Sequence, residues 1–335
     1  MKTAPGFEFP PDMARQLHKA RRLEWLSLLY VGSAAALLWV TMGSSQAMRT
    51  GFFDDLISLV PAIAFLVCTR IAPRTPDQTF PYGYHGVVSI GYLTASLALV
   101  AMGLFLLIEA VAKFALGERT TIGGMHLFGH TVWAGWPMLV ALAYSSIPSF
   151  FLGRAKLRLG PKIHDKILFA DAQMMKADWM VGVATAIGVL GVGFGYWWMD
   201  PLAAAVASFD ILKDGFTNVG VAVADLMERR PRKTDRSGDE PLPDEIRRRM
   251  EDLAWVRTAD VRLREVGHVF FGEVFVVPRD GVPNLPARIR EAVDMVKGLN
   301  WRVHDVTVTA LDRPLEPQAE GSTQAPPERL AARGS

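Results

Sequence analysis

Hydrophobic residues in this chain gather in six long stretches, separated by shorter polar connections. The stretches cover approximately residues 25–47, 51–72, 86–112, 129–153, 167–192 and 199–224. Each stretch reaches the ~20 residues that an α-helix needs to cross the hydrocarbon core of a bilayer. The pattern therefore predicts an α-helical membrane domain of six transmembrane helices over residues 25–226.

The positions of lysine and arginine predict how this domain is oriented. These residues gather before the first stretch, after the second, between the fourth and fifth, and after the sixth. The other connections hold only Arg49, Lys113 and Arg119. Since basic residues concentrate on the cytoplasmic side of membrane proteins, we expect the segment 1–24 and the C-terminal part to be cytoplasmic.

Composition indicates that the chain also has a part outside the membrane. It is 50% hydrophobic with a mean hydropathy of +0.19, too apolar for an ordinary soluble enzyme and too polar for a protein that is membrane throughout. After a charged linker at 227–242, the residue pattern predicts one further compact domain over 243–312. The tail 313–335 is rich in Pro, Gln, Ala, Gly and Ser, and is predicted to be disordered.

The domain at 243–312 combines both kinds of periodicity. Helical patterns cover 243–253 and 285–299, and alternating patterns typical of strands cover 256–264, 268–277 and 301–311. The first two strands flank a turn at Gly267. This order predicts a small cytoplasmic α+β domain of the ferredoxin-like type, with its sheet covered on one face.

Acidic residues stand out inside two of the apolar stretches. Asp54 and Asp55 lie in the second stretch, and Asp171 and Asp178 lie in the fifth. At 100° per residue, Asp171, Met174 and Asp178 share one ~100° stripe of a helix. A charge inside a span costs roughly 2.5–3.5 kcal/mol on insertion scales, so such residues usually face the bundle interior, water or an ion. The pattern alone leaves open whether the two acidic clusters meet.

Three motifs on these stretches point to a known family. The segments are FPYGYHG at 80–86, ADAQMMKADW at 170–179 and DPLAAAVASFDILKDG at 200–215. They resemble the H-P-Y-G-Y-G-R, A-D-A-x-H-x-x-x-D and D-P-x-x-A…L-K-x-G motifs of the cation diffusion facilitator family of divalent-metal transporters. The resemblance covers roughly residues 20–312. It implies a homodimeric carrier that exports a divalent metal cation by alternating access, with proton antiport.

The resemblance also implies where the transported metal binds. The family's site takes two residues four apart from the second span and two from the fifth, and each pair lies on one helix face. In this sequence the pairs become Asp54 with Ser58, and Met174 with Asp178. A methionine thus stands where the family has a histidine. For Asp54 and Asp178, the alternative role is that of a structural acid bonded to a neighbouring helix.

Two further acids are candidate metal ligands beside these pairs. Asp55 points ~100° away from Asp54, and coordination and helix packing are both open for it. Asp171 lies a turn and a half from the cytoplasmic end of its stretch, a position that favours a gate or a water-facing residue over a ligand. For Met174, side-chain packing and metal ligation are both open.

The chemistry of these side chains narrows the choice of metal. Carboxylate and hydroxyl oxygens suit Mn²⁺, Fe²⁺ or Zn²⁺, a thioether suits softer ions, and the missing imidazole weakens a preference for tetrahedral zinc. We expect no cofactor beyond the transported metal, with zinc, iron and manganese as the shortlist. The single cysteine, Cys68, excludes an internal disulfide and a zinc site built on cysteines.

In the cytoplasmic domain, the resemblance implies further zinc ligands that this sequence lacks. The corresponding positions are Ala259, Phe275 and Thr309, which are not useful ligands, and His164, His268 and His304 lie elsewhere. We therefore expect a domain that dimerises without a zinc cluster at that place.

Four other polar residues are candidates for a metal or proton path: His85, Glu109, Lys176 and Asp210. Each has a plainer alternative, at the membrane interface for His85 and in helix packing for the acids. Lys176 could neutralise Asp55 or Asp210, or reach the headgroups by snorkelling.

The sequence thus predicts a carrier rather than an enzyme, in a membrane of the bacterial inner-membrane type. Its expected partners are the divalent cation, protons, membrane lipid and a second copy of the chain, without nucleic acid. One alternative is a metal sensor or regulatory subunit of the same fold, which binds without transporting. Another is a membrane enzyme, against which the sequence shows no nucleophile with a base, no H-E-x-x-H spacing and no phosphate loop.

Overall fold

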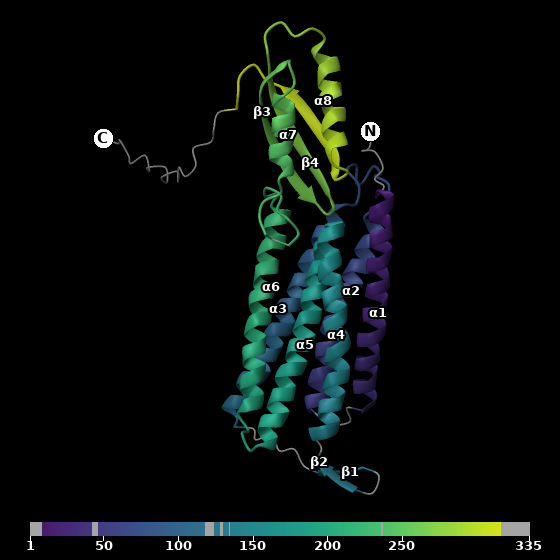
Figure 1. The fold of residues 1–335 in the computed structure, drawn as a ribbon, viewed down its shortest axis with the longest axis vertical. Helices are drawn as coiled ribbons and strands as arrows, with labels where there is room; N and C mark the ends of the chain where they lie inside the picture. Colours follow the sequence, from purple (N-terminus) through teal and green to yellow (C-terminus); the bar gives the residue numbers. More distant parts are fainter. Residues whose placement is uncertain are drawn as a thin grey trace, which may run out of the picture.

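The protein is a bundle of long helices that carries a small α/β domain at one end (Figure 1). The computed structural model describes residues 9–41, 46–117, 124–127, 130–133, 135–235 and 237–315. The long helices are α1 (Pro11–Thr41), α2 (Gln46–Ile71), α3 (Gly86–Ala115), α4 (Gly135–Ile163), α5 (Lys166–Gly193) and α6 (Met199–Leu226).

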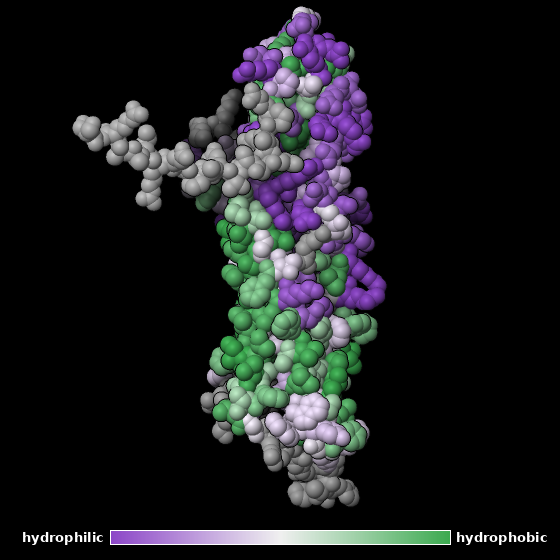
Figure 2. Space-filling model, turned by 90° about the vertical axis from the view of Figure 1, so that its left-hand side faces the viewer, coloured by the Kyte–Doolittle hydropathy of each residue, from purple (hydrophilic) through white to green (hydrophobic). Residues whose placement is uncertain are grey.

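Four helices among the described residues are long and apolar enough to cross a membrane. They are Phe52–Ile71 within α2, Gly86–Ala115, Met138–Ile163 within α4, and Lys166–Gly193. On the face drawn in Figure 2, hydrophobic residues cover much of the helical bundle, and hydrophilic residues gather toward the end that carries the α/β domain. The predicted membrane domain is confirmed as helical, and the number of six spans stays a prediction.

The start of the fourth predicted span is wrong. Residues 130–133 belong to β2 (His130–Trp133), which pairs antiparallel with β1 (Gly124–Leu127), and α4 begins only at Gly135. Residues such as Thr, Val and Trp favour strands as well as apolar spans, so hydropathy alone could not separate the two.

Two of the long helices continue beyond the stretches that hydropathy marked. Helix α4 runs on to Ile163, so most of the basic segment taken as a connection is its last turns. Helix α1 begins at Pro11, inside the predicted N-terminal segment. Both extensions are charged, and a hydropathy window ends a span where charge begins.

The C-terminal domain follows the predicted order of elements. It consists of α7 (Leu242–Glu251), β3 (Val256–Val266), β4 (Val269–Pro278), α8 (Leu285–Leu299) and β5 (Val303–Ala310). The sheet order is β3-β4-β5, with β3 and β4 antiparallel and β5 parallel to β4 across the α8 connection. The bounds agree with the predicted ones to within about two residues. Three described strands show a small sheet, and the ferredoxin-like class stays a prediction.

Both helices of this domain cover one face of its sheet. Ile246 and Met250 of α7 and Val296 of α8 are fully buried against Val274 and other valines and leucines of the strands. On the opposite face, the guanidinium of Arg262 lies 5.0 Å from the centre of the Phe275 ring. The predicted tail 313–335 lies outside the described residues from 316 onward.

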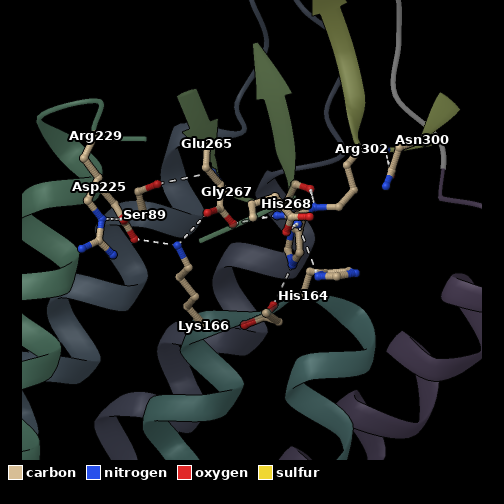
Figure 3. Close-up of polar contacts among 12 residues, drawn as sticks. Ser89, His164, Lys166, Asp225, Arg229, Glu265, Gly267, His268, Asn300 and Arg302 are labelled. Carbon is tan, nitrogen blue, oxygen red and sulfur yellow. Dashed lines mark hydrogen bonds and ion pairs between the residues drawn. The ribbon is translucent and has the colours of Figure 1, made fainter. Parts of the chain in front are cut away.

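The turn between β3 and β4 docks onto the start of α3. Gly267 has φ +65°, and its N–H donates to the hydroxyl of Ser89 at 3.3 Å (Figure 3). A Cβ at this position would lie 2.5 Å from the carbonyl oxygen of His85 and 3.1 Å from Cβ of Val88. Glycine is therefore required twice, by the backbone conformation and by the close approach.

We predict that Gly267→Ala destabilises the protein more than Gly281→Ala does. Gly281 also has a positive φ, +74°, but nothing lies within 4 Å of the Cβ position. The control therefore carries only the conformational cost, about 1 kcal/mol, whereas Gly267→Ala adds a clash with α3. Thermal unfolding of the purified chain measures both, and equal losses would show that the turn is not held against the bundle.

Candidate metal site

Helices α2 and α5 meet at two of the predicted site residues. The hydroxyl of Ser58 on α2 donates a hydrogen bond to Oδ1 of Asp178 on α5 at 2.8 Å. Ser58 is buried and Asp178 is partly buried. The acidic stripe of the fifth predicted span therefore faces the second span at this point, inside the bundle.

Asp54 lies one helical turn before Ser58, on the same face of α2. Its Oδ1 is buried and has no hydrogen-bond partner in the described part of the chain. A buried carboxylate oxygen without a partner is costly, so this position calls for a proton or a cation. Asp55, the next residue, is partly buried. The structure thus brings Asp54, Ser58 and Asp178 into one region of the bundle.

Met174 lies one turn before Asp178 but in a different environment. Its side chain is fully buried in an apolar cluster with Ala98, Leu106 and Ile211, contributed by α3 and α6. Such contacts are typical of a methionine that fills a gap between helices. The structure therefore favours the packing role among the two that the sequence left open.

Asp171 is not the water-facing residue that its place in the sequence indicated. Its Oδ2 accepts a hydrogen bond from Nζ of Lys156 on α4, and Lys156 also donates to Oε2 of Glu24 on α1 at 2.8 Å. All three side chains are 0% exposed. We call these three residues the buried triad. Its two carboxylates outnumber its one ammonium, and Glu24 Oε1 and Asp171 Oδ1 have no partner among the described residues.

Glu24 and Lys156 had no predicted role because both fell in segments that were predicted to be cytoplasmic. Lys156 was counted with the basic connection, and Glu24 with the N-terminal segment. Both segments continue as helices, which the sequence pattern did not indicate. The helical turn points Glu24 and Lys156 toward the bundle, while most of their basic neighbours remain exposed.

The other acids considered for a metal or proton path are held by lysines. Nζ of Lys176 lies 2.7 Å from Oδ2 of Asp210 and 3.0 Å from Oδ2 of Asp214 on α6. The neutralising partner of Lys176 is therefore Asp210, not Asp55, together with Asp214, which the sequence reasoning missed. At the other end of the bundle, Glu109 pairs with Lys113 at 2.9 Å.

A polar network joins the bundle to the C-terminal domain (Figure 3). Nζ of Lys166, at the start of α5, lies 2.7 Å from both Asp225 Oδ2 at the end of α6 and Glu265 Oε2 on β3. Arg302, next to β5, donates to the other oxygen of Glu265 at 2.7 Å. Two charged groups of the C-terminal domain thus converge on the beginning of α5.

Asp165 links the same two parts of the molecule. It is the N-cap of α5, and its Oδ1 accepts the N–H of Leu168 at 2.9 Å. Its Oδ2 lies 2.8 Å from Nε2 of His268, which is buried in the turn just before β4. The C-terminal domain therefore contributes to capping the helix that carries Asp178.

Four histidines, His85, His164, His268 and His304, gather at this junction. The rings of His85 and His304 have centroids 4.9 Å apart, and His164 lies beside Arg302. Burial lowers the pKa of His85 to about 4, and the neighbouring His304 and His268 add to the effect. Burial, with the charge of Arg302, likewise lowers the pKa of His164 to about 4.

Within the described residues, no three His, Cys, Asp or Glu side chains are grouped closely enough to hold a metal ion by themselves. Ala259, Phe275 and Thr309, the positions considered for zinc, lie on the strands of the C-terminal sheet. The candidate site in the bundle therefore consists of two carboxylates and a hydroxyl on α2 and α5.

We predict that Lys156→Met destabilises the protein by roughly 3–5 kcal/mol, because it leaves two buried carboxylates without their cation. Lys113→Met is the matched control, since its partly exposed pair with Glu109 contributes about 1 kcal/mol or less. Unfolding of both variants in detergent gives the comparison. Similar losses would mean that the buried triad is already neutral.

We also predict that the stability of the protein falls as the pH drops from about 6.5 to about 4. The unfolded chain binds protons on His85 and His164 near their ordinary pKa of 6.5, whereas the folded chain does so only near 4. The free energy of unfolding therefore decreases as the pH falls through this window. Above about pH 6.5 these two groups do not change it. His85→Gln should flatten the dependence in melting curves recorded across the range, and a dependence as steep as that of the wild type would contradict this assignment.

Comparisons with known proteins place this geometry in a wider context. Residues 25–227 match the family model described as the cation efflux transmembrane domain. The chain is 26% identical over 181 residues to the manganese efflux system protein MneS of Bacillus subtilis, which covers 54% of this chain and 58% of that protein. The match to MneS thus spans less than two thirds of its length.

Two other relatives match over more of the chain. It is 26% identical over 243 residues to the manganese efflux system protein MneP of Bacillus subtilis, covering 70% of this chain and 75% of MneP. It is 24% identical over 295 residues to the magnetosome protein MamM of Magnetospirillum gryphiswaldense, covering 85% of this chain and 87% of MamM.

Proposed function

This chain belongs to the cation diffusion facilitator family of cation efflux proteins, and on that premise we propose that it exports a divalent metal cation in exchange for protons. Membership supports transport of a metal cation in general. The direction, the coupled ion and the binding residues are proposals that rest on the bundle described above.

The observation that carries this proposal is the contact between Ser58 and Asp178 beside the unpartnered oxygen of Asp54. It brings two carboxylates and a hydroxyl from different helices together at a buried place, where a divalent cation would neutralise both acids. Asp55, the next residue on α2, would complete the coordination if its side chain turned toward Asp54. Met174, packed among apolar side chains, stays out of it.

Manganese is the first cargo to test. Carboxylate and hydroxyl oxygens suit Mn²⁺, and without an imidazole the site has no particular preference for zinc. Two of the relatives are named as manganese efflux proteins. Iron and zinc remain on the shortlist because oxygen ligands also accept them.

Exchange of metal for protons follows from the ligands themselves. A divalent cation binds ionised carboxylates, so its arrival releases any protons that Asp54 and Asp178 carry. When movement of the helices opens the site to the other side, protons compete the metal off the same oxygens. Alternating access of this kind requires the contact between α2 and α5 to open and close.

The proposal includes the arrangement of the chain in the membrane. Helices α1 and α6 pack with the four apolar helices and would complete six spans. The distribution of basic residues favours a cytoplasmic C-terminal domain and N-terminus, in a membrane of the bacterial inner-membrane type. A second copy would make the working unit a homodimer, as the family resemblance implies.

A metal sensor or regulatory subunit is the second candidate. It is favoured by one observation, that Met174, which stands where the family has a histidine, packs among apolar side chains. Such a protein would bind the cation without carrying it across the membrane.

We predict that Asp178→Asn and Asp54→Asn abolish metal flux into liposomes under a pH gradient, measured for Mn²⁺, Fe²⁺, Zn²⁺ and Co²⁺. Each change removes the charge but keeps the shape of the side chain. Ser58→Ala should weaken metal affinity by roughly 10–100-fold, the range for a group that supports a metal ligand.

Asp210→Asn is the matched control for this assay, because it removes one carboxylate from α6 while Lys176 keeps Asp214. It should transport like the wild type. Flux that survives Asp178→Asn would refute the site. Calorimetric binding without flux in the wild type would refute the carrier and favour the sensor.

A further inference from the structure

Helices α1 and α4 run antiparallel side by side, and two contacts fix their register. The ion pair of Glu24 with Lys156 joins them at one level, and the hydroxyl of Tyr30 donates to the carbonyl of Tyr144 at 3.3 Å at another. Positions before Glu24 on α1 therefore lie level with positions after Lys156 on α4, toward the C-terminal domain.

Five basic residues lie on the outer side of this helix pair. Arg154, Arg158 and Lys162 are spaced four apart on α4, so they follow one another along one face. Arg22 and Lys19 are spaced three apart on α1, on the side of that helix away from Glu24. All five are exposed, and Arg22 is as far above Glu24 as Arg158 is above Lys156, about 3 Å along the axis.

None of these five cations has an ion pair with a carboxylate within the described ranges. The nearby acids are already engaged: Glu24 and Asp171 with Lys156, Asp12 with Arg15, and Asp165 with His268. Some exposed arginines elsewhere do have a carboxylate partner, as Arg230 with Asp244 shows. These five side chains therefore carry positive charge that the protein does not neutralise.

Directly below the cations, the same two helices expose large apolar side chains. Leu26 and Leu29 lie on α1, and Ile147 and Phe151 lie on α4. Leu29 is 73% exposed and Phe151 is 65% exposed. Ile147, Phe151, Arg154, Arg158 and Lys162 follow one another three or four residues apart on one side of α4, and we call these five residues the α4 face. It has a positive end toward the C-terminal domain and an apolar end toward the middle of the bundle.

We propose that the α4 face binds an anionic phospholipid, with the phosphate against Arg158 and Lys162 and an acyl chain along Ile147 and Phe151. Arginine and lysine side chains bind phosphate through charge-assisted hydrogen bonds. A basic cluster at the end of membrane helices is the arrangement that attracts anionic headgroups. The apolar continuation favours a lipid over a free phosphate, which would use only the cations.

The test uses the full chain, purified in a neutral detergent and freed of lipid. Phosphatidylglycerol and phosphatidylcholine with identical acyl chains are added in turn, and bound lipid is counted by native mass spectrometry. We expect a clear preference for phosphatidylglycerol that weakens with added salt. Each cation near the headgroup contributes roughly fivefold to affinity.

The variant Arg154→Gln/Arg158→Gln/Lys162→Gln should lose affinity for phosphatidylglycerol on the order of 100-fold, by the same contribution per cation. The control Arg249→Gln/Arg290→Gln/Arg313→Gln removes the same charge from exposed positions of the C-terminal domain and should bind like the wild type. If the first variant does not fold, Arg158→Gln alone should still lose about fivefold.

Two outcomes would overturn the proposal. Equal preference for phosphatidylglycerol in the wild type and the triple variant would show that the cations do not hold the headgroup. Displacement of the lipid by glycerol phosphate at the same concentration would show an anion site in which the acyl chain has no part.

Discussion

The pairing of Lys156 with Glu24 and Asp171 is the interaction on which the arrangement of the helices depends. Removing such charges from water costs several kcal/mol for each ion, and the cost is recovered only where the partners stay in contact. These three residues therefore hold α1, α4 and α5 at one level. Any motion of the bundle has to move these helices together or separate buried charges.

Helix α5 extends this constraint to the rest of the molecule. Near its start, Lys166 contacts the end of α6 and the C-terminal domain, and further along, Lys176 contacts α6 again. Between these ion pairs and the apolar end of the helix lies Asp178, bonded to α2. A shift of the C-terminal domain would thus reach the candidate site through one rigid element, which is the kind of physical link that coupling between distant sites requires.

The sequence predicted the elements well where one periodicity dominated. The helix over 285–299 and the strands on either side of Gly267 were found because apolar residues repeat there with a clear period and a glycine marks the turn. The strands β1 and β2 were missed because a short apolar segment has the same composition in a strand as in a span.

The acids of the candidate site could be predicted from the sequence, but most of the side chains that contact acids of the bundle could not. Asp54 and Asp178 stood out as acids in apolar stretches, and the family resemblance added Ser58. Lys156 could not be assigned to Asp171, because hydropathy ended the fourth span before it and no local pattern states which helices are neighbours. The burial of Met174 among residues of α3 and α6 is likewise a property of the packed bundle.

The acids of the bundle fall into two groups by the charge that faces them. Asp171, Asp210 and Glu109 each contact a lysine, so a cation of the protein already faces each of them. For Asp54 and Asp178 the described residues offer only the hydroxyl of Ser58. A carboxylate with a permanent cation has little to gain from a metal, whereas one without it must take up a proton or a metal ion when buried. Among the described residues no lysine contacts Asp54 or Asp178, and this is as informative as their spacing, because only a proton or a bound metal ion is then left to neutralise the pair.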